Sequence, residues 1–191
     1  MSSKRYTFVD CFTPLAQLSQ SPSTLLALTE QTILRAVDLV VQQSSCKVLL
    51  VLDAPDVMLA LNPSLASHEL SLLLLNLRGA PGVHATVISC SADLPLLSAA
   101  AADAQDGRVP TSLEERGAGF VVQQAHNAAL VMGVRELETG AARDVSGVLR
   151  VTRGSSFAHG EGAADRYVET EKLYLVQRDG SASVFERGAG A

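Results

Sequence analysis

The chain has 191 residues, of which 47% are hydrophobic, and this is enough apolar side chain for one globular domain with a sizeable core. Its 15 Lys and Arg residues against 20 Asp and Glu residues leave a formal net charge of −5. That balance excludes a broadly basic surface that coats nucleic acid, so any such contact would be a local patch or be shared with partner subunits. We expect a single domain over residues 1–191.

The cysteines and the first residues predict an intracellular protein. Cys11, Cys46 and Cys90 are odd in number, widely spaced and each beside an apolar run, which is typical of reduced core thiols. No C-x-x-C or Cys/His cluster predicts a metal site. The N-terminus has no signal-peptide core, and no run of about 18 apolar residues predicts a membrane span. We expect the cytoplasm or the nucleus.

The first elements alternate between strand and helix. Tyr6–Phe12 is rich in aromatic and β-branched residues, which favours a strand. Ser21 and Pro22 supply an N-cap and a first helical residue for an amphipathic helix that reaches about Gln43. Val48–Leu52 is an unbroken apolar run, typical of a strand buried in a parallel sheet.

A second helix is predicted to start at Asn62 and Pro63 and to stop at Gly79. Its apolar stripe contains Leu70, Leu73, Leu74 and Leu77. Leu72 and Leu75 widen this stripe beyond what one face of a sheet needs. Two interpretations remain open: a deeply buried helix, or a helix that also contacts a neighbouring subunit.

The remaining segments complete an α/β pattern. Val83–Cys90 predicts a third strand, Leu94 to about Gln105 another helix, and Thr111 with Glu114 a capping box that opens a further helix. From Asn127 onward the spacing of the apolar residues changes from helical to strand-like. The four strand candidates are NAALVMGVREL, SGVLRVTRG, EKLYLVQR and SASVFER, of which the last two are joined by the hairpin signal Asp-Gly. We predict an α/β fold with a mostly parallel sheet, flanked by helices and extended by a C-terminal antiparallel β meander.

Asp53 raises the question of nucleotide chemistry, because P-loop ATPases hold Mg²⁺ with an acid at the end of such a strand. The phosphate-binding motif G-x-x-x-x-G-K-[ST] is absent from the sequence. Ala54 also occupies the place where many such ATPases have a glutamate. We therefore interpret Asp53 as a residue that ends a core strand and caps the next turn. It is a Walker B-like position that is vestigial.

No catalytic residue, cofactor or metal ligand is predicted elsewhere. The sequence contains no G-x-S-x-G motif, and Ser155 and Ser156 near His159 lie in a loop that is unsuited to holding a nucleophile and a base in register. We therefore do not expect an enzyme.

Arginines outnumber lysines 12 to 3, and arginine suits phosphate recognition. Arg143, Arg150 and Arg153 are the candidates for contact with nucleic acid or with a partner subunit. Arg150 and Arg153 are separated by an odd number of residues, so on one regular strand they face opposite sides. The alternative interpretation is that these are solvated or salt-bridged strand residues.

Three segments carry a family resemblance when taken in order. These are VLLVLDAPDVMLAL from Val48, ARDVSGVLRVTRG from Ala142 to Gly154, and EKLYLVQRDGSASVFERG from Glu171 to Gly188. Together they resemble the sixth subunit of Elongator, the eukaryotic complex that modifies the wobble uridine of tRNAs. The resemblance covers about Tyr6 to Gly188, and the DVSGVLRVTRG block is its most telling part.

The resemblance implies a RecA-like core without working nucleotide motifs. It implies a hexameric ring with two copies each of this chain and of the fourth and fifth Elongator subunits. Such a ring docks on the catalytic subcomplex and binds tRNA, and ATP hydrolysis by the ring is linked to tRNA release. The chemistry on uridine belongs to another subunit.

One departure from the family pattern concerns the N-terminus. Family members usually carry another β-α unit ahead of the segment that here starts at Met1, including the strand and turn that correspond to a P-loop.

The alternatives to the Elongator assignment are a degenerate recombinase-like regulatory subunit in DNA repair and a stand-alone small-molecule α/β enzyme.

Overall fold

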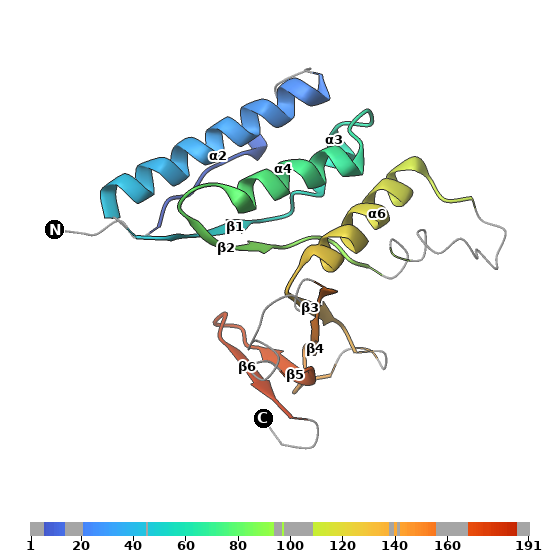
Figure 1. The fold of residues 1–191 in the computed structure, drawn as a ribbon. Helices are drawn as coiled ribbons and strands as arrows, with labels where there is room; N and C mark the ends of the chain where they lie inside the picture. Colours follow the sequence, from blue (N-terminus) through green and yellow to red (C-terminus); the bar gives the residue numbers. More distant parts are fainter. Residues whose placement is uncertain are drawn as a thin grey trace. The chain divides into compact units, whose positions relative to one another are not determined.

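The computed structural model describes residues 6–13, 21–44, 46–93, 97, 109–137, 140, 142–155 and 168–186. The chain divides into two compact units, Met1–Val122 and Gln123–Ala191. Figure 1 shows helices, a two-stranded parallel sheet and a four-stranded antiparallel sheet. The predicted α/β class is confirmed at this level, and the expectation of a single domain stays a prediction.

The first unit follows the predicted alternation of helix and strand. Its elements are α2 (Pro22–Ser44), β1 (Val48–Leu52), α3 (Val57–Leu61), α4 (Ser67–Gly79), β2 (Val83–Ile88) and the first part of α6 (Ser112–Asn127). β1 and β2 pair in parallel, and α2 and α4 lie side by side on one face of this pair (Figure 1). The helix predicted from Leu94 lies outside the described residues apart from Leu97.

The start of α6 is a capping box, as predicted. The Glu114 carboxylate accepts hydrogen bonds from the Thr111 backbone N–H at 2.7 Å and from the Thr111 hydroxyl at 2.9 Å. The Thr111 hydroxyl oxygen in turn accepts from the Glu114 N–H at 3.3 Å. These bonds satisfy donors that a helix leaves unpaired at its N-terminus.

The start of α4 differs from the prediction. Asn62 ends the short helix α3, and its side-chain oxygen accepts from the Ser64 N–H at 3.1 Å to make a turn. α4 begins at Ser67, where Glu69 accepts from the Ala66 N–H at 2.9 Å. The predicted start at Asn62 is wrong because the Asn side chain competes for the local backbone and closes a turn.

The core of the first unit lies between the helices and the sheet. Its buried members are Leu25, Ile33, Val37, Met58, Leu59, Leu65, Leu70, Leu73, Leu74, Leu77 and Phe120. Leu72 and Leu75, in contrast, are 55% and 54% exposed. The interpretation of α4 as a deeply buried helix is therefore wrong, and the contact with a neighbouring subunit stays a prediction.

Arg116 on α6 joins three parts of this unit. Its Nη1 donates to the carbonyl oxygens of Leu59 at 3.2 Å, Asn62 at 3.2 Å and Leu65 at 2.8 Å. Helices leave their last carbonyls without partners, and here one cation collects those at the end of α3 and in the turn that follows.

The strand predicted at Tyr6–Phe12 is not observed, because no residue from Tyr6 to Cys11 belongs to a helix or strand. Near its end the Asp10 carboxylate accepts from the backbone N–H groups of Phe12 and Thr13 and from the Thr13 hydroxyl. A strand requires a ladder partner, whereas these local bonds turn the chain at Asp10.

The second unit contains the β meander. Its strands are β3 (Leu130–Arg135), β4 (Gly147–Arg153), β5 (Thr170–Val176) and β6 (Ala182–Phe185), which pair antiparallel in this order. Gly180 closes the predicted β5–β6 hairpin at a φ of 83°, a conformation that favours glycine. In the described residues no ladder joins this sheet to β1 or β2, so the prediction of one continued sheet is not met.

The glycines at the two ends of β4 allow close approach of the backbone. A Cβ at Gly147 would lie 2.3 Å from the Arg135 carbonyl oxygen, and a Cβ at Gly154 would lie 2.0 Å from that of Ala128. Both distances are far below van der Waals contact, so the neighbouring backbone would have to move. On β3, in contrast, a Cβ at Gly133 would meet no atom within 4 Å.

We predict that Gly154→Ala lowers the free energy of unfolding by at least about 2 kcal/mol, since backbone atoms and not flexible side chains block the added methyl. Urea unfolding followed by circular dichroism measures this. Gly133→Ala is the matched control and should stay within about 0.5 kcal/mol of the parent. Equal effects of the two variants would contradict the packing described for β4.

Candidate functional site

The carboxyl ends of β1 and β2 meet at one edge of the parallel sheet, the usual place for ligands in α/β folds. The Ser89 hydroxyl, just after β2, donates a short hydrogen bond to Asp53 Oδ1, just after β1. The Ala54 N–H donates to the Ser89 carbonyl at 3.2 Å and to its hydroxyl at 3.1 Å. The prediction that Asp53 ends a strand is confirmed, and the hydrogen bond of its carboxylate is to Ser89 across the sheet edge.

Asp56 and Cys90 follow the same ends of the two strands, Asp56 a few residues after β1 and Cys90 shortly after β2. Asp56 Oδ2 accepts from the Ser91 N–H at 3.3 Å, and Asp56 Oδ1 is buried without a hydrogen-bond partner. Burial, and then the charge of Asp56, raise the pKa of the half-buried Cys90 thiol to about 11. This thiol is therefore neutral at neutral pH and is a poor nucleophile.

The other two cysteines differ from each other in burial. Cys11 is half-buried and packs against the core, and burial and then the charge of Asp10 raise its pKa as well. Cys46 is exposed, so the prediction of core thiols is wrong for this residue.

Within the described ranges no three His, Cys, Asp or Glu side chains gather where they could hold a metal ion. Nor does any helix in those ranges have the length and apolar content to cross a membrane.

The predicted arginine sites lie on and beside the antiparallel sheet. Arg143 is exposed in the connection between β3 and β4. Arg150 is opposite Gly133 on β3 and Glu171 on β5, whereas Arg153 is opposite Leu130. β4 keeps a regular register over this stretch, so Arg150 and Arg153 face opposite sides of the sheet, as their spacing predicts. The three residues do not form one patch.

Arg135 was missed by the sequence interpretation. It lies two residues from Gly133 on β3 and therefore shares a face with Arg150. Its guanidinium is 3.9 Å from the Glu171 carboxylate, and both side chains are partly exposed. Its proximity to Arg150 depends on the pairing of two strands, which no spacing in the sequence reveals.

A second pair that the sequence did not single out is His126 and Ser155. Ser155 Oγ donates its proton to the His126 carbonyl oxygen at 2.7 Å, and His126 Nδ1 is 3.2 Å from the same Oγ. While the hydroxyl proton is donated to the carbonyl, the second contact requires the tautomer in which Nδ1 carries the proton. In that tautomer Nδ1 does not accept the Ser155 proton. His159 lies outside the described residues.

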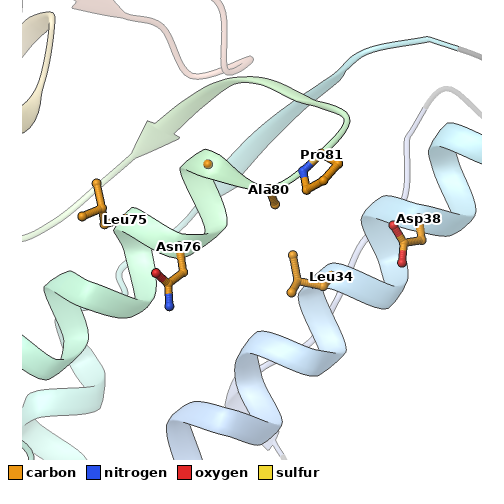
Figure 2. A pocket seen from close by; sticks show the side chains of 7 residues that line it. Leu34, Asp38, Leu75, Asn76, Ala80 and Pro81 are labelled. Atoms are coloured by element: carbon orange, nitrogen blue, oxygen red, sulfur yellow. The ribbon is translucent and has the colours of Figure 1, made fainter.

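A groove of about 620 Å³ lies between α2 and the end of α4 (Figure 2). It is lined by Leu34, Asp38, Leu75, Asn76, Gly79, Ala80 and Pro81. Asp38 is the one ionisable side chain of this lining, which contains no Ser, Thr, Cys, Lys or His. The groove therefore offers apolar contact and not a set of groups that could perform catalysis.

No protein-family model matches the chain, and the search of curated proteins finds no match.

We predict that Cys90 is alkylated far more slowly than the exposed Cys46 at pH 8, since a pKa of about 11 leaves almost no thiolate at Cys90. Removing the charge in Asp56→Asn should lower the pKa of Cys90 and speed its alkylation, because a nearby negative charge disfavours the thiolate. Mass spectrometry after iodoacetamide treatment measures both rates. Asp93→Asn, near the same end of the sheet, is the control, and an equal acceleration there would contradict the assigned cause.

Proposed function

We propose that the protein is a non-catalytic, RecA-like subunit of the Elongator accessory ring. With the fourth and fifth Elongator subunits it would complete a hexamer that docks on the catalytic subcomplex and presents tRNA for wobble-uridine modification, in the cytoplasm or the nucleus. The observation that carries the proposal is the ordered set of three sequence segments, above all DVSGVLRVTRG.

The geometry of these segments supports a structural role for them. The DVSGVLRVTRG block contains β4, and an added Cβ would lie 2.3 Å from a backbone carbonyl oxygen at Gly147 and 2.0 Å from one at Gly154. The C-terminal segment forms the β5–β6 hairpin. These residues determine how the strands pack, so the resemblance that they carry concerns the fold and not a catalytic group.

The parallel sheet supports assembly with other chains. On the face away from α2 and α4, Leu49, Val51 and Val87 are 60%, 62% and 50% exposed. Parallel sheets are normally covered by helices on both faces, so a chain with one uncovered apolar face favours further packing. The exposed Leu72 and Leu75 of α4 add apolar surface outside the core.

The carboxyl edge of that sheet supports a subunit without its own nucleotide chemistry. The sequence contains no phosphate-binding loop, and the Asp53 carboxylate accepts a hydrogen bond from Ser89. Ring-level ATP hydrolysis would then depend on the partner subunits.

We predict that this chain, co-expressed with the fourth and fifth Elongator subunits of one source, assembles into a hexamer with two copies of each. The uncovered apolar surfaces are the reason that we also expect little soluble protein from the chain alone. Native mass spectrometry measures the stoichiometry. A soluble, folded monomer that binds neither partner subunit would refute the assignment to Elongator.

We predict that Arg150→Gln or Arg143→Gln in the assembled ring weakens tRNA binding about threefold to tenfold, since each loses a phosphate-binding fork. Filter binding with tRNA at fixed salt measures this. Arg35→Gln, the same change at an exposed position on α2, is the control. Tighter binding of single-stranded DNA than of tRNA would instead favour the recombinase-like alternative.

A further inference from the structure

β3 is an edge strand of the antiparallel sheet in the described part of the chain. The strand order is β3-β4-β5-β6, so only one side of β3 has a partner. Edge strands usually carry charges, prolines or bulges that prevent pairing with another chain. The segment Leu130–Val134 has no charged residue and no proline, and its register with β4 has no bulge. This edge is therefore open to pairing with a further strand.

The backbone groups of β3 alternate between β4 and the open edge. The Gly154 N–H donates to the Ala129 carbonyl at 2.9 Å, and these two residues are opposite each other when the register is continued by one residue. In an antiparallel pair, residues that exchange hydrogen bonds alternate with residues that do not. Gly133 therefore bonds to β4. The residues that direct their N–H and carbonyl groups to the open edge are Leu130, Met132 and Val134.

The side chains at this edge are apolar as well. Met132 and Val134 are 66% and 65% exposed, more than any other large hydrophobic residue in the four strands. A strand that offers both free backbone groups and apolar side chains is suited to the addition of another apolar strand, in which backbone hydrogen bonds hold the partner and side chains select it.

A second copy of β3 complements this edge. Met132 lies midway between Leu130 and Val134, so a two-fold axis at Met132 places each outward residue of one copy opposite an outward residue of the other. Met132 is then opposite Met132 of the second copy, and Leu130 is opposite Val134. All the outward N–H and carbonyl groups of these residues find partners, and the opposed side chains are all apolar.

The charged residues at the end of β3 favour the same register. With the axis at Met132, Arg135 is opposite Ala129 of the second copy, so no like charges are opposed. An axis at Val134 would also match outward groups, but it would put Glu136 opposite the apolar Met132. The axis at Met132 therefore suits both the backbone and the side chains.

We propose that two copies of the chain pair antiparallel through β3, with a two-fold axis at Met132. The pairing joins two four-stranded sheets into one continuous sheet. The interface is isologous, because both copies contribute the same residues. It removes the open edge of β3 in both copies and covers part of the apolar surface at Met132 and Val134. This inference does not depend on the proposed function.

Disulfide trapping in the full-length chain tests the register, with Cys46→Ser to remove the exposed native thiol. Met132→Cys should link two copies on oxidation with diamide, because opposed hydrogen-bonded residues have Cα atoms about 5.5 Å apart, within the reach of a disulfide. Val184→Cys is the control, since Val184 is an exposed apolar residue of the same sheet but lies on β6. Non-reducing gel electrophoresis should show at least about tenfold more linked dimer for Met132→Cys.

Equal linkage of the two variants would overturn the proposal, because it would show random collision. Absence of linkage at Met132→Cys would also overturn it, since a strand of the same chain or of another protein would then occupy the edge.

A proline variant separates backbone pairing from apolar contact. The Met132 N–H is directed to the open edge, so Met132→Pro keeps the β3–β4 ladder, and edge strands tolerate proline at such a position. Proline has no N–H to donate to the second copy. Analytical ultracentrifugation of the full-length chain should therefore show a dimer at least about tenfold weaker than that of Met132→Ala, which loses the side chain and keeps the N–H. Equal dimerisation of the two variants would contradict pairing through the β3 backbone.

Discussion

The packing of the first unit depends on the guanidinium of Arg116. Its three bonds to the carbonyls of Leu59, Asn62 and Leu65 hold the end of a five-residue helix and the turn into α4. So short a helix is not stable by itself, and its last carbonyls have no partners of their own. Leu59 and Leu65 are almost fully buried, so their backbone oxygens need a donor from within the protein. With α4 placed, one face of the parallel sheet is covered.

Local signals predicted most elements, because their causes lie within the elements. The proline and apolar period of α2, the capping box of α6 and the Asp179-Gly180 turn are each read from neighbouring residues. The features that were predicted wrongly or missed depend on distant residues, or on local side-chain hydrogen bonds that compete with a helix or strand. Tyr6–Phe12 has strand composition but no ladder, and Asn62 closes a turn in place of starting a helix. The partners of Arg116 are more than fifty residues away, beyond any local pattern.

The candidate sites show the same division. The sequence located Asp53 at a strand end and placed Arg150 and Arg153 on opposite faces, since both conclusions need only the period of one strand. Ser89 beside Asp53, and Arg135 beside Arg150, depend on which strands pair and in which register. The raised pKa of Cys90 likewise depends on burial and on Asp56, which reaches it from the other end of an α crossover.

The opposed arginines of β4 have a consequence for how the meander could be used. β4 lies inside its sheet, between β3 and β5, so a single rigid ligand on one side does not reach both guanidinium groups. The sheet therefore acts as a partition between two chemically independent surfaces. One carries Arg150 with Arg135 and Glu171, and the other carries Arg153 with the exposed Met132 and Val134. A charged polymer and an apolar protein surface could occupy the two sides at once without competing.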